Sequence, residues 1–210
     1  MRLSGSYLVL ILSVASIATC RSAGAKRPMQ NSSPTLSVTK AKVQDSALQL
    51  SYRVENPSDR PIYLVARLFR RSAAGFATDP NLVYTEVKNG TLQLTKAMIP
   101  VPDHIDVEVP EVPYVVKVEA GKAFDETLRV PVPVEPFHPY AGVKRAGEVH
   151  SFAKVELVVG WLADDGIKVD PVARAGQPAE LQIHHQTVAT KQHLLTAAVG
   201  VAVPARIAAP

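Results

Sequence analysis

The sequence has few of the residues and motifs from which catalytic and metal sites are commonly built. Its single cysteine in 210 residues excludes an internal disulfide and any zinc site with several thiolate ligands. It contains no G-x-S-x-G nucleophile elbow, no H-E-x-x-H zinc motif and no G-x-G-x-x-G dinucleotide turn. Gly121-Lys122 lacks the upstream glycine and the following serine or threonine of a phosphate-binding loop. These absences predict a protein that is not an enzyme and that uses no cofactor.

Acidic residues are missing from the first 34 positions, which carry four basic residues, Arg2, Arg21, Lys26 and Arg27. The whole chain has 23 basic and 19 acidic residues, so removing these four leaves 19 of each sign in the remaining sequence. Nucleic-acid-binding domains gather an excess of Lys and Arg on one face. A formally neutral body therefore predicts no nucleic-acid partner.

The N-terminal segment has the pattern of a secretory signal. Arg2 precedes a mostly apolar run over residues 3–18, which is short for a membrane span. The run ends at Ile17-Ala18-Thr19-Cys20, and Cys20 is the only cysteine. This ending resembles the lipobox of bacterial lipoproteins, with Thr19 where glycine, alanine or serine is usual. The resemblance implies cleavage before Cys20, diacylation of Cys20 and stable attachment to a membrane.

Two other interpretations of this segment remain open. Cleavage after Ala23-Gly24-Ala25 would release a soluble protein, and an uncleaved segment would use Cys20 only as a small apolar residue. In the lipoprotein interpretation, Arg21 stands where an aspartate usually signals inner-membrane retention, which favours the outer membrane of a Gram-negative cell. We therefore expect a signal peptide over residues 1–19, the lipid-bearing Cys20 with a flexible tether over residues 20–34, and one folded domain over residues 35–210.

From residue 35 onward, apolar and polar residues alternate with the period of a β-strand. The clearest case is the segment with Leu48, Leu50, Tyr52 and Val54, which leads into the turn Asn56-Pro57-Ser58-Asp59. We expect this segment to form a hairpin-like unit with the alternating residues 62–68. Asn89-Gly90 predicts a second hairpin. Further strands are expected over residues 82–88, 91–95, 105–109, 113–119, 123–134, 152–161, 179–184 and about 191–203.

No segment shows a convincing helical stripe, and only residues 141–150 offer a short helical turn. With 47% apolar but only 6% aromatic residues, the core is expected to consist of Val, Leu and Ile, with Trp161 beside Val155, Leu157 and Val159. Roughly nine short strands with frequent turns predict an all-β sandwich. The prolines of Val130-Pro131-Val132-Pro133-Val134 place that stretch at a sheet edge or in an extended connector.

The fold prediction is sharpened by a partial resemblance. Val54-Glu55-Asn56-Pro57-Ser58, followed by Pro61-Ile62-Tyr63-Leu64, looks like the start of several bacterial immunoglobulin-like accessory domains. The turn Ala120-Gly121-Lys122 before Phe124 and Leu128 is similar to a turn in the same group, which includes the proteinase-inhibitor type of β-sandwich. The resemblance covers less than half of the chain. It implies a single immunoglobulin-like β-sandwich behind the signal segment.

Two sets of side chains are candidates for binding. The first set follows the Pro-rich stretch and consists of Phe137, His138 and Tyr140. Aromatic residues on a stiff loop make good contacts with a protein partner. The alternative is that this loop plugs one end of the sandwich.

Histidines are the remaining metal-ligand candidates. His185 and His193 would meet across paired strands, joined by His104, His138 or His150. Because six histidines scattered over loops and strand surfaces explain the pattern more simply, we predict no metal site.

Together these features predict a non-enzymatic lipoprotein of the bacterial cell envelope that faces the periplasm or the exterior. Its domain is expected to be a binding, assembly or structural module, held at the membrane by the lipid and offering a surface to an envelope protein. A protease inhibitor that presents residues 130–140 is the main alternative. A hydrolase or metal-binding protein without a recognisable motif is the third.

Overall fold

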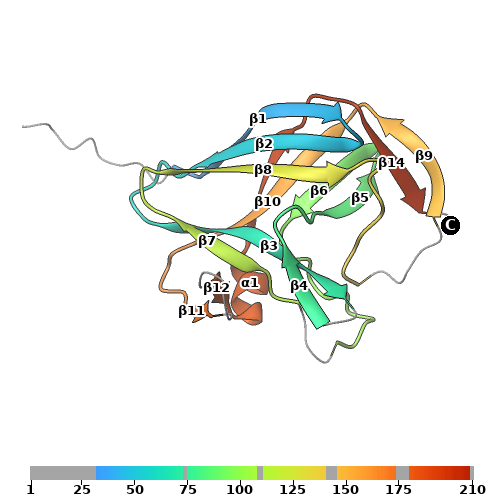
Figure 1. Ribbon diagram of the computed structural model, residues 1–210. Coiled ribbons are helices and arrows are strands. Elements are labelled where there is room, and N and C mark those ends of the chain that lie inside the picture. The colour runs from blue at the N-terminus through green and yellow to red at the C-terminus, as the bar shows by residue number, and fades with distance from the viewer. Residues whose placement is uncertain (1–31, 73–74, 108–110, 141–145, 174–179, 209–210) are drawn as a thin grey trace, which may run out of the picture.

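The computed structural model describes residues 32–72, 75–107, 111–140, 146–173 and 180–208 (Figure 1). The described part of the chain is mostly β, with one short helix, as the alternating pattern predicts. The strands form several open sheets. The coarse fold class is therefore confirmed, while the immunoglobulin-like topology stays a prediction.

The first sheet is antiparallel and has the order β1-β2-β8. Its strands are β1 (Thr35–Gln44), β2 (Ala47–Glu55) and β8 (Ala123–Pro131). Leu48, Leu50, Tyr52 and Val54 of β2 are all buried, which confirms the face expected from their alternation. Pro131 ends an edge strand, where its missing N–H costs no sheet hydrogen bond.

The second sheet is larger, with the order β11-β12-β7-β3-β10-β6-β5, while β13 pairs with β10 and β4 with β3. Strands β6 and β10 run parallel, and the other pairs are antiparallel. The bounds are β3 (Ile62–Ser72), β4 (Gly75–Asp79), β5 (Tyr84–Lys88), β6 (Thr91–Lys96), β7 (Tyr114–Val118), β10 (Val155–Ala163), β11 (Val169–Val172), β12 (Glu180–Ile183) and β13 (His193–Ala198).

A two-stranded ribbon and a helix complete the described chain. The ribbon pairs β9 (Ala146–Phe152) with β14 (Val203–Ala208), on the right of Figure 1. The helix α1 (His185–Lys191) lies between β12 and β13 in the sequence and buries Val188. The helical turn expected over residues 141–150 is wrong for residues 146–150, which belong to β9.

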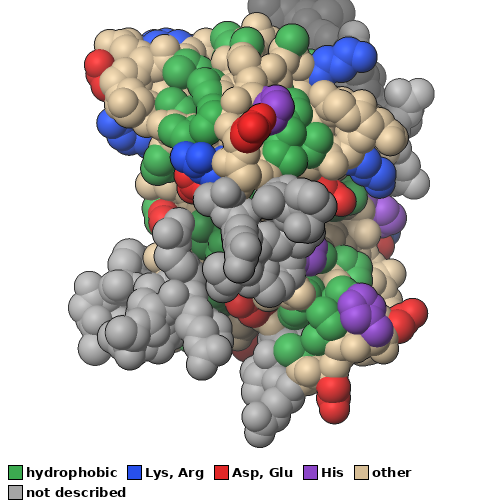
Figure 2. All heavy atoms as spheres, turned by 90° about the vertical axis from the view of Figure 1, so that its right-hand side faces the viewer, with side chains coloured by type: hydrophobic (Ala, Val, Ile, Leu, Met, Phe, Trp, Pro, Cys, Tyr) green, Lys and Arg blue, Asp and Glu red, His purple; other side chains and the backbone are tan. Residues whose placement is uncertain are grey.

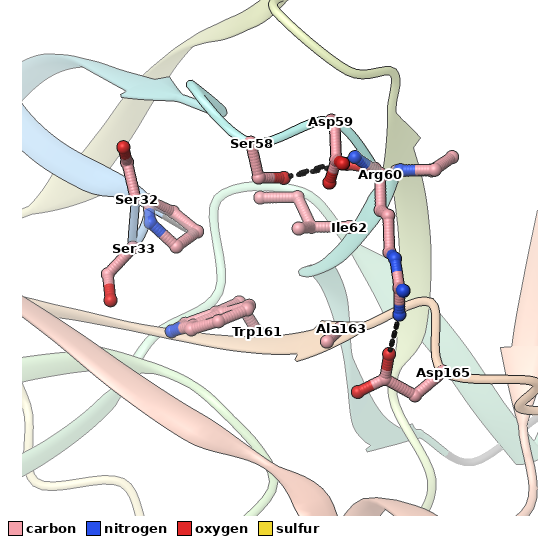
Figure 3. Close-up of a pocket in the computed structure, with 11 residues that line it drawn as sticks. Ser32, Ser33, Ser58, Asp59, Arg60, Ile62, Trp161, Ala163 and Asp165 are labelled. Atoms are coloured by element: carbon pink, nitrogen blue, oxygen red, sulfur yellow. Dashed lines mark hydrogen bonds and ion pairs between the residues drawn. The ribbon is translucent and has the colours of Figure 1, made fainter. Parts of the chain in front are cut away.

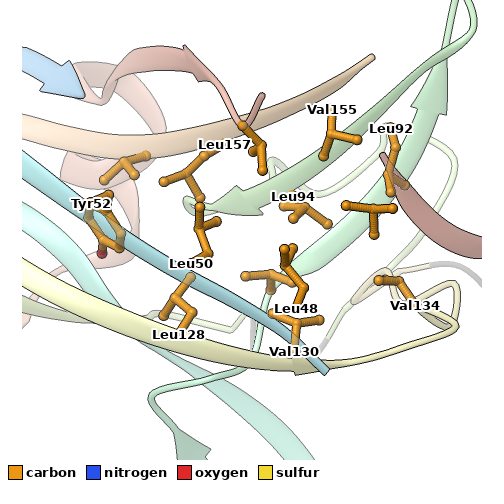
Figure 4. Close-up of a cluster of buried hydrophobic side chains, with 14 of the residues drawn as sticks. Leu48, Leu50, Tyr52, Leu92, Leu94, Leu128, Val130, Val134, Val155 and Leu157 are labelled. Carbon is orange, nitrogen blue, oxygen red and sulfur yellow. The ribbon is translucent and has the colours of Figure 1, made fainter. Parts of the chain in front are cut away.

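The main core lies between the two sheets. Leu48 and Leu50 of β2 face Leu94 of β6 and Leu157 of β10, and all four side chains have no exposed surface (Figure 4). The cluster is almost wholly aliphatic, as the low aromatic content predicts. Full burial of a Leu side chain contributes roughly 1.5–3 kcal/mol. The facing aliphatic rows therefore hold the two sheets together.

A second apolar cluster covers the other face of the larger sheet. It contains Val65, Leu162, Ile183 and the helix residue Val188, each with no exposed surface. Gln192, just after α1, pairs with the backbone of Met98: its Oε1 accepts from Met98 N–H, and its Nε2 donates to the Met98 carbonyl, both at 2.9 Å. Gly160 leaves room for this amide, since a Cβ there would lie 2.5 Å from Gln192 Oε1.

Three strand predictions differ in outcome. The Asn89-Gly90 hairpin is confirmed, with β5 and β6 joined by two residues at φ of 52° and 75°. The hairpin expected from residues 48–68 is wrong, because β2 belongs to the first sheet and β3 to the second. The strand expected over residues 105–109 is absent from its described part, residues 105–107. Alternation reports which face of a strand is buried, but it does not identify the neighbouring strand.

Fourteen strands are described where roughly nine were expected. The strand expected over residues 179–184 is confirmed as β12. Two of the strands that were not expected are short: β4 has five residues, and β11 has four, includes Pro171 and shows no alternation of burial. Segments of this length carry too few positions for a period-2 pattern to appear in the sequence.

Candidate functional site

The predicted lipidation site, Cys20, lies outside the described residues, so its modification stays a prediction. The described chain begins at Ser32, twelve positions after Cys20. An extended segment of that length spans at most roughly 40 Å. Among the described residues, no helix has both the length and the apolar character needed to cross a membrane.

The loop with Phe137, His138 and Tyr140 is half-buried rather than projecting. The Phe137 ring stacks on Tyr84 with the ring centroids 5.6 Å apart, and it packs against the second apolar cluster. Its N–H donates to Thr85 Oγ1 at 2.7 Å, and its carbonyl accepts from the Thr85 N–H at 2.8 Å. The His138 and Tyr140 rings meet edge to face at 6.2 Å. This conformation matches the plug alternative, while partner contact by these three residues stays a prediction.

Beside this loop, Glu111 accepts a hydrogen bond from the Tyr84 hydroxyl at 3.0 Å. Burial raises the pKa of Glu111 above its usual value, although the hydrogen bond from Tyr84 opposes the shift. Burial, together with the negative charge of Glu111, also raises the pKa of Tyr84 and of Tyr140. Folding therefore disfavours the ionised form of Glu111 relative to the unfolded chain.

We expect the Glu111→Gln variant to be more stable than the wild type at pH 7, and the difference to shrink as the pH falls towards 4. When folding raises the pKa of a carboxyl, the protonated carboxyl stabilises the fold. This contribution is complete at pH values below the unfolded pKa, and it is lost as the pH rises through the folded pKa. Glutamine keeps an acceptor for Tyr84 but does not titrate. Urea unfolding at several pH values measures the difference, and a difference independent of pH would contradict the prediction.

The histidines are spread over the described structure. Among the described residues, no group of three or more His, Cys, Asp or Glu side chains is arranged to hold a metal ion. His185 begins α1, and His193 begins β13, so the pairing of two strands suggested by the sequence is wrong for this pair. His193 instead packs its ring against Trp161, with the ring centroids 4.9 Å apart.

Charged side chains are interspersed with uncharged ones on the face of the molecule shown in Figure 2. One ionic network, however, is inside the protein. Lys96 at the end of β6 has no exposed side-chain surface, and its Nζ donates to Glu126 Oε2 at 2.6 Å and to the Pro80 carbonyl at 2.9 Å. Glu126 on β8 is 11% exposed. It also accepts from Arg67 Nη1 at 2.8 Å and from the Tyr52 hydroxyl at 2.5 Å.

The network joins the two sheets through one carboxylate. Burial lowers the pKa of Lys96, and the attraction of Glu126 opposes that shift. Burial and Glu126 raise the pKa of Tyr52, so this hydroxyl remains protonated and donates. Each of these charged groups has a partner within the protein, which fits a role in holding the sheets in register.

A groove of about 300 Å³ opens at another place, where the described chain enters the fold (Figure 3). We call it the Trp161 groove. Three stretches of the chain line it: residues 32–34 before β1, residues 58–62, which lead into β3, and Trp161, Ala163 and Asp165 at the end of β10 and just after it. Trp161 occupies the same face of β10 as the buried residues Leu157 and Val159, but its indole is only partly buried.

Polar side chains surround the indole at the rim of this groove. Arg60 Nη1 donates to Asp165 Oδ1 at 2.9 Å, and both side chains are more than half exposed. The Ser58 hydroxyl donates to Asn56 Oδ1 at 2.7 Å. The groove therefore has one partly buried aromatic side chain, with hydrogen-bond donors and acceptors at its edge.

Asn56 fixes the turn that supplies one wall of the groove. Its side chain is buried, with 1% of its surface exposed. Its Oδ1 accepts from the Ser58 N–H at 3.2 Å. Its Nδ2 donates to three backbone carbonyls, those of Arg60, Val118 and Glu119, at 2.8, 3.1 and 3.2 Å.

The same asparagine joins two turns that are distant in the sequence. The Asn56 N–H donates to the Lys122 carbonyl, and the Asn56 carbonyl accepts from the Gly121 N–H, each at 2.9 Å. Gly121 adopts a φ of 66°, which favours glycine. The two turn motifs noted in the sequence are thus neighbours in space, and together they shape one end of the molecule.

Sequence reasoning did not identify the groove or the ionic network. The pattern Leu92-x-Leu94-x-Lys96 does place Lys96 on the buried face of β6, but a lysine at the end of a strand is usually solvated. The sequence predicts Trp161 as a core residue. In the structure its indole is only partly buried, whereas Val159, two positions earlier on the same face of β10, is fully buried. Comparison with family models, with curated proteins and with solved structures found no match.

Proposed function

We propose that this chain is a non-enzymatic lipoprotein of the bacterial cell envelope, with an immunoglobulin-like β domain that acts as a binding, assembly or structural module. The observation that carries the proposal is the position of the only cysteine, Cys20, at the end of an apolar run that ends in Ile17-Ala18-Thr19. Two acyl chains on one cysteine suffice for stable membrane attachment. The absence of Asp at position 21 favours the outer membrane of a Gram-negative cell.

The geometry of the domain supports the binding role among these three. The Trp161 groove is lined by Ser32, Ser33 and Pro34, which are the last residues of the expected tether and the first that the structure describes. A lipid on Cys20 would therefore hold this groove within a tether length of the membrane surface. Beyond residue 34 the domain has equal numbers of basic and acidic residues. Its charge therefore does not favour adhesion to an anionic membrane surface, and attachment of the domain would depend on the lipid.

We expect the Cys20→Ser variant to be released from its membrane or mislocalised when the full chain is expressed in a Gram-negative bacterium, and to lose the acylation of position 20. The wild type should fractionate with membranes, incorporate radiolabelled palmitate and show the mass of a diacylglyceryl group on Cys20. Ser22→Ala, two positions along, is the matched control and should retain all three properties. A wild-type protein whose mature chain begins at Lys26, or whose Cys20 carries a free thiol, would overturn the proposal.

A further inference from the structure

We infer that the Trp161 groove binds the ring of a neutral sugar. The inference rests on the binding role proposed above, although not on the lipid anchor. Trp161 is the only tryptophan of the chain, and it lies on the floor of the groove beneath Ile62 (Figure 3). The groove volume of about 300 Å³ is at the lower end of the range for small-ligand sites.

The indole is held in place by its neighbours on the adjacent strands. Trp161 lies opposite Leu64 of β3 and opposite His193 of β13. Leu64 is buried, and the His193 ring packs against the indole with the ring planes 33° apart. The face of an indole carries partial negative charge, which attracts the positively polarised C–H groups on the flat side of a pyranose ring. A fixed aromatic platform binds such a ring with little loss of conformational entropy.

The rim matches the hydroxyls that project from the edge of a sugar ring. Arg60 offers only donors, and Asp165 offers only acceptors, 2.9 Å apart. Neighbouring hydroxyls both donate and accept, so they can bridge the guanidinium and the carboxylate together. Ser33 and Ser58 add further hydroxyl groups on the facing walls. A ligand with only apolar edges would leave these groups without compensation for the water they lose.

The charges at the rim favour a neutral ligand over an anionic one. Two carboxylates, Asp59 and Asp165, line the groove with a single guanidinium, Arg60. This arrangement gives a formal charge of −1, which repels phosphate, sulfate and uronate groups. A neutral glycan is the class that fits the aromatic floor, the paired donors and acceptors, and the charge.

The single tryptophan allows binding to be read at the groove itself. The full chain, in a detergent without a sugar headgroup, is titrated with chitotetraose and with cellotetraose while Trp161 emission is recorded under excitation at 295 nm. At least one of the two should produce a saturable change in emission, with half-saturation below about 1 mM. Tetragalacturonate and adenosine serve as anionic and flat aromatic competitors.

Matched variants separate the groove from the rest of the surface. Arg60→Ala and Asp165→Ala should each raise the half-saturating concentration at least about tenfold. Arg53→Ala removes a similar exposed ion pair, Arg53–Asp125 at 3.0 Å, on the first sheet and should leave binding unchanged. For Trp161→Ala, ligand-detected NMR should show binding lost while the melting curve remains cooperative.

Three results would overturn the inference: no saturable change with either neutral oligosaccharide up to about 10 mM, equal weakening by Arg53→Ala and Arg60→Ala, or tighter binding of tetragalacturonate or adenosine. Sugar binding is measured on purified protein and anchoring in cells. Failure of one therefore leaves the result of the other intact.

Discussion

Replacing Glu126 with alanine is expected to lower the free energy of unfolding by about 3–5 kcal/mol, because it leaves a buried charge without its partner. Lys96 has no exposed side-chain surface, and of its two hydrogen bonds to described residues the one to the Pro80 carbonyl remains without Glu126. The Tyr52 hydroxyl, also buried, loses its acceptor. Arg67 is 33% exposed and can be solvated, so its contribution to the loss is small.

Two further variants identify the cause of this destabilisation. Asp125→Ala, one residue earlier on β8, removes an exposed ion pair with Arg53 and should cost at most about 1 kcal/mol. The triple variant Tyr52→Phe, Lys96→Met, Glu126→Leu replaces the buried network by apolar side chains and should recover most of the stability lost in Glu126→Ala. Urea unfolding measures all three, and equal losses for Glu126→Ala and Asp125→Ala would contradict the prediction.

The destabilisation of Glu126→Ala should also depend on pH. Burial already lowers the pKa of Lys96, and removal of Glu126 takes away the largest opposing attraction. When folding lowers the pKa of a lysine, there is a pH interval between the folded and the unfolded pKa. In this interval the unfolded chain holds a proton that the folded chain has released, so the free energy of unfolding rises with pH. The deficit of Glu126→Ala relative to the wild type should therefore narrow as the pH is raised from neutral towards the usual pKa of lysine.

What the sequence predicts well is local. Alternation in Leu48-x-Leu50-x-Tyr52-x-Val54 identifies the buried face of β2 because side chains on a strand alternate between its two faces whatever the strand pairs with. The Asn89-Gly90 turn is predictable for the same reason, since the positive φ values of a two-residue hairpin are a property of those two residues.

What the sequence does not predict depends on residues that are far apart in the chain. Lys96 and Glu126 are separated by 30 positions, and each reads as a surface residue until the two sheets bring them together. The Trp161 groove is formed by three stretches that span more than 130 positions, from Ser32 to Asp165. The assumed hairpin after β2 failed for the same reason: a turn such as Asn56-Pro57-Ser58 fits a crossing between sheets as well as a return within one.

We expect Asn56→Asp to lower the free energy of unfolding by at least about 3 kcal/mol at pH 7, although the two side chains have nearly the same shape. Asn56 Nδ2 donates to three backbone carbonyls, and an ionised carboxylate has no proton to give them. The buried charge would face three carbonyl oxygens, which raises the pKa of the new carboxyl. A carboxyl whose pKa is raised by folding contributes stability in its protonated form, at pH values below its unfolded pKa. Part of the lost free energy of unfolding should therefore be recovered as the pH falls.

Asn81→Asp provides the matched control for this substitution. The Asn81 side chain uses its Oδ1 to accept a hydrogen bond from the Arg129 N–H at 2.8 Å, and an aspartate retains that acceptor. It should therefore change the stability by less than about 1 kcal/mol. Asn56 also holds Ser58 and Arg60 at the wall of the Trp161 groove. At temperatures where the protein is still folded, Asn56→Asp should therefore shift the emission of Trp161. Asn81→Asp should leave this emission unchanged. Equal losses of stability in the two variants would show that the three donated hydrogen bonds do not carry the effect.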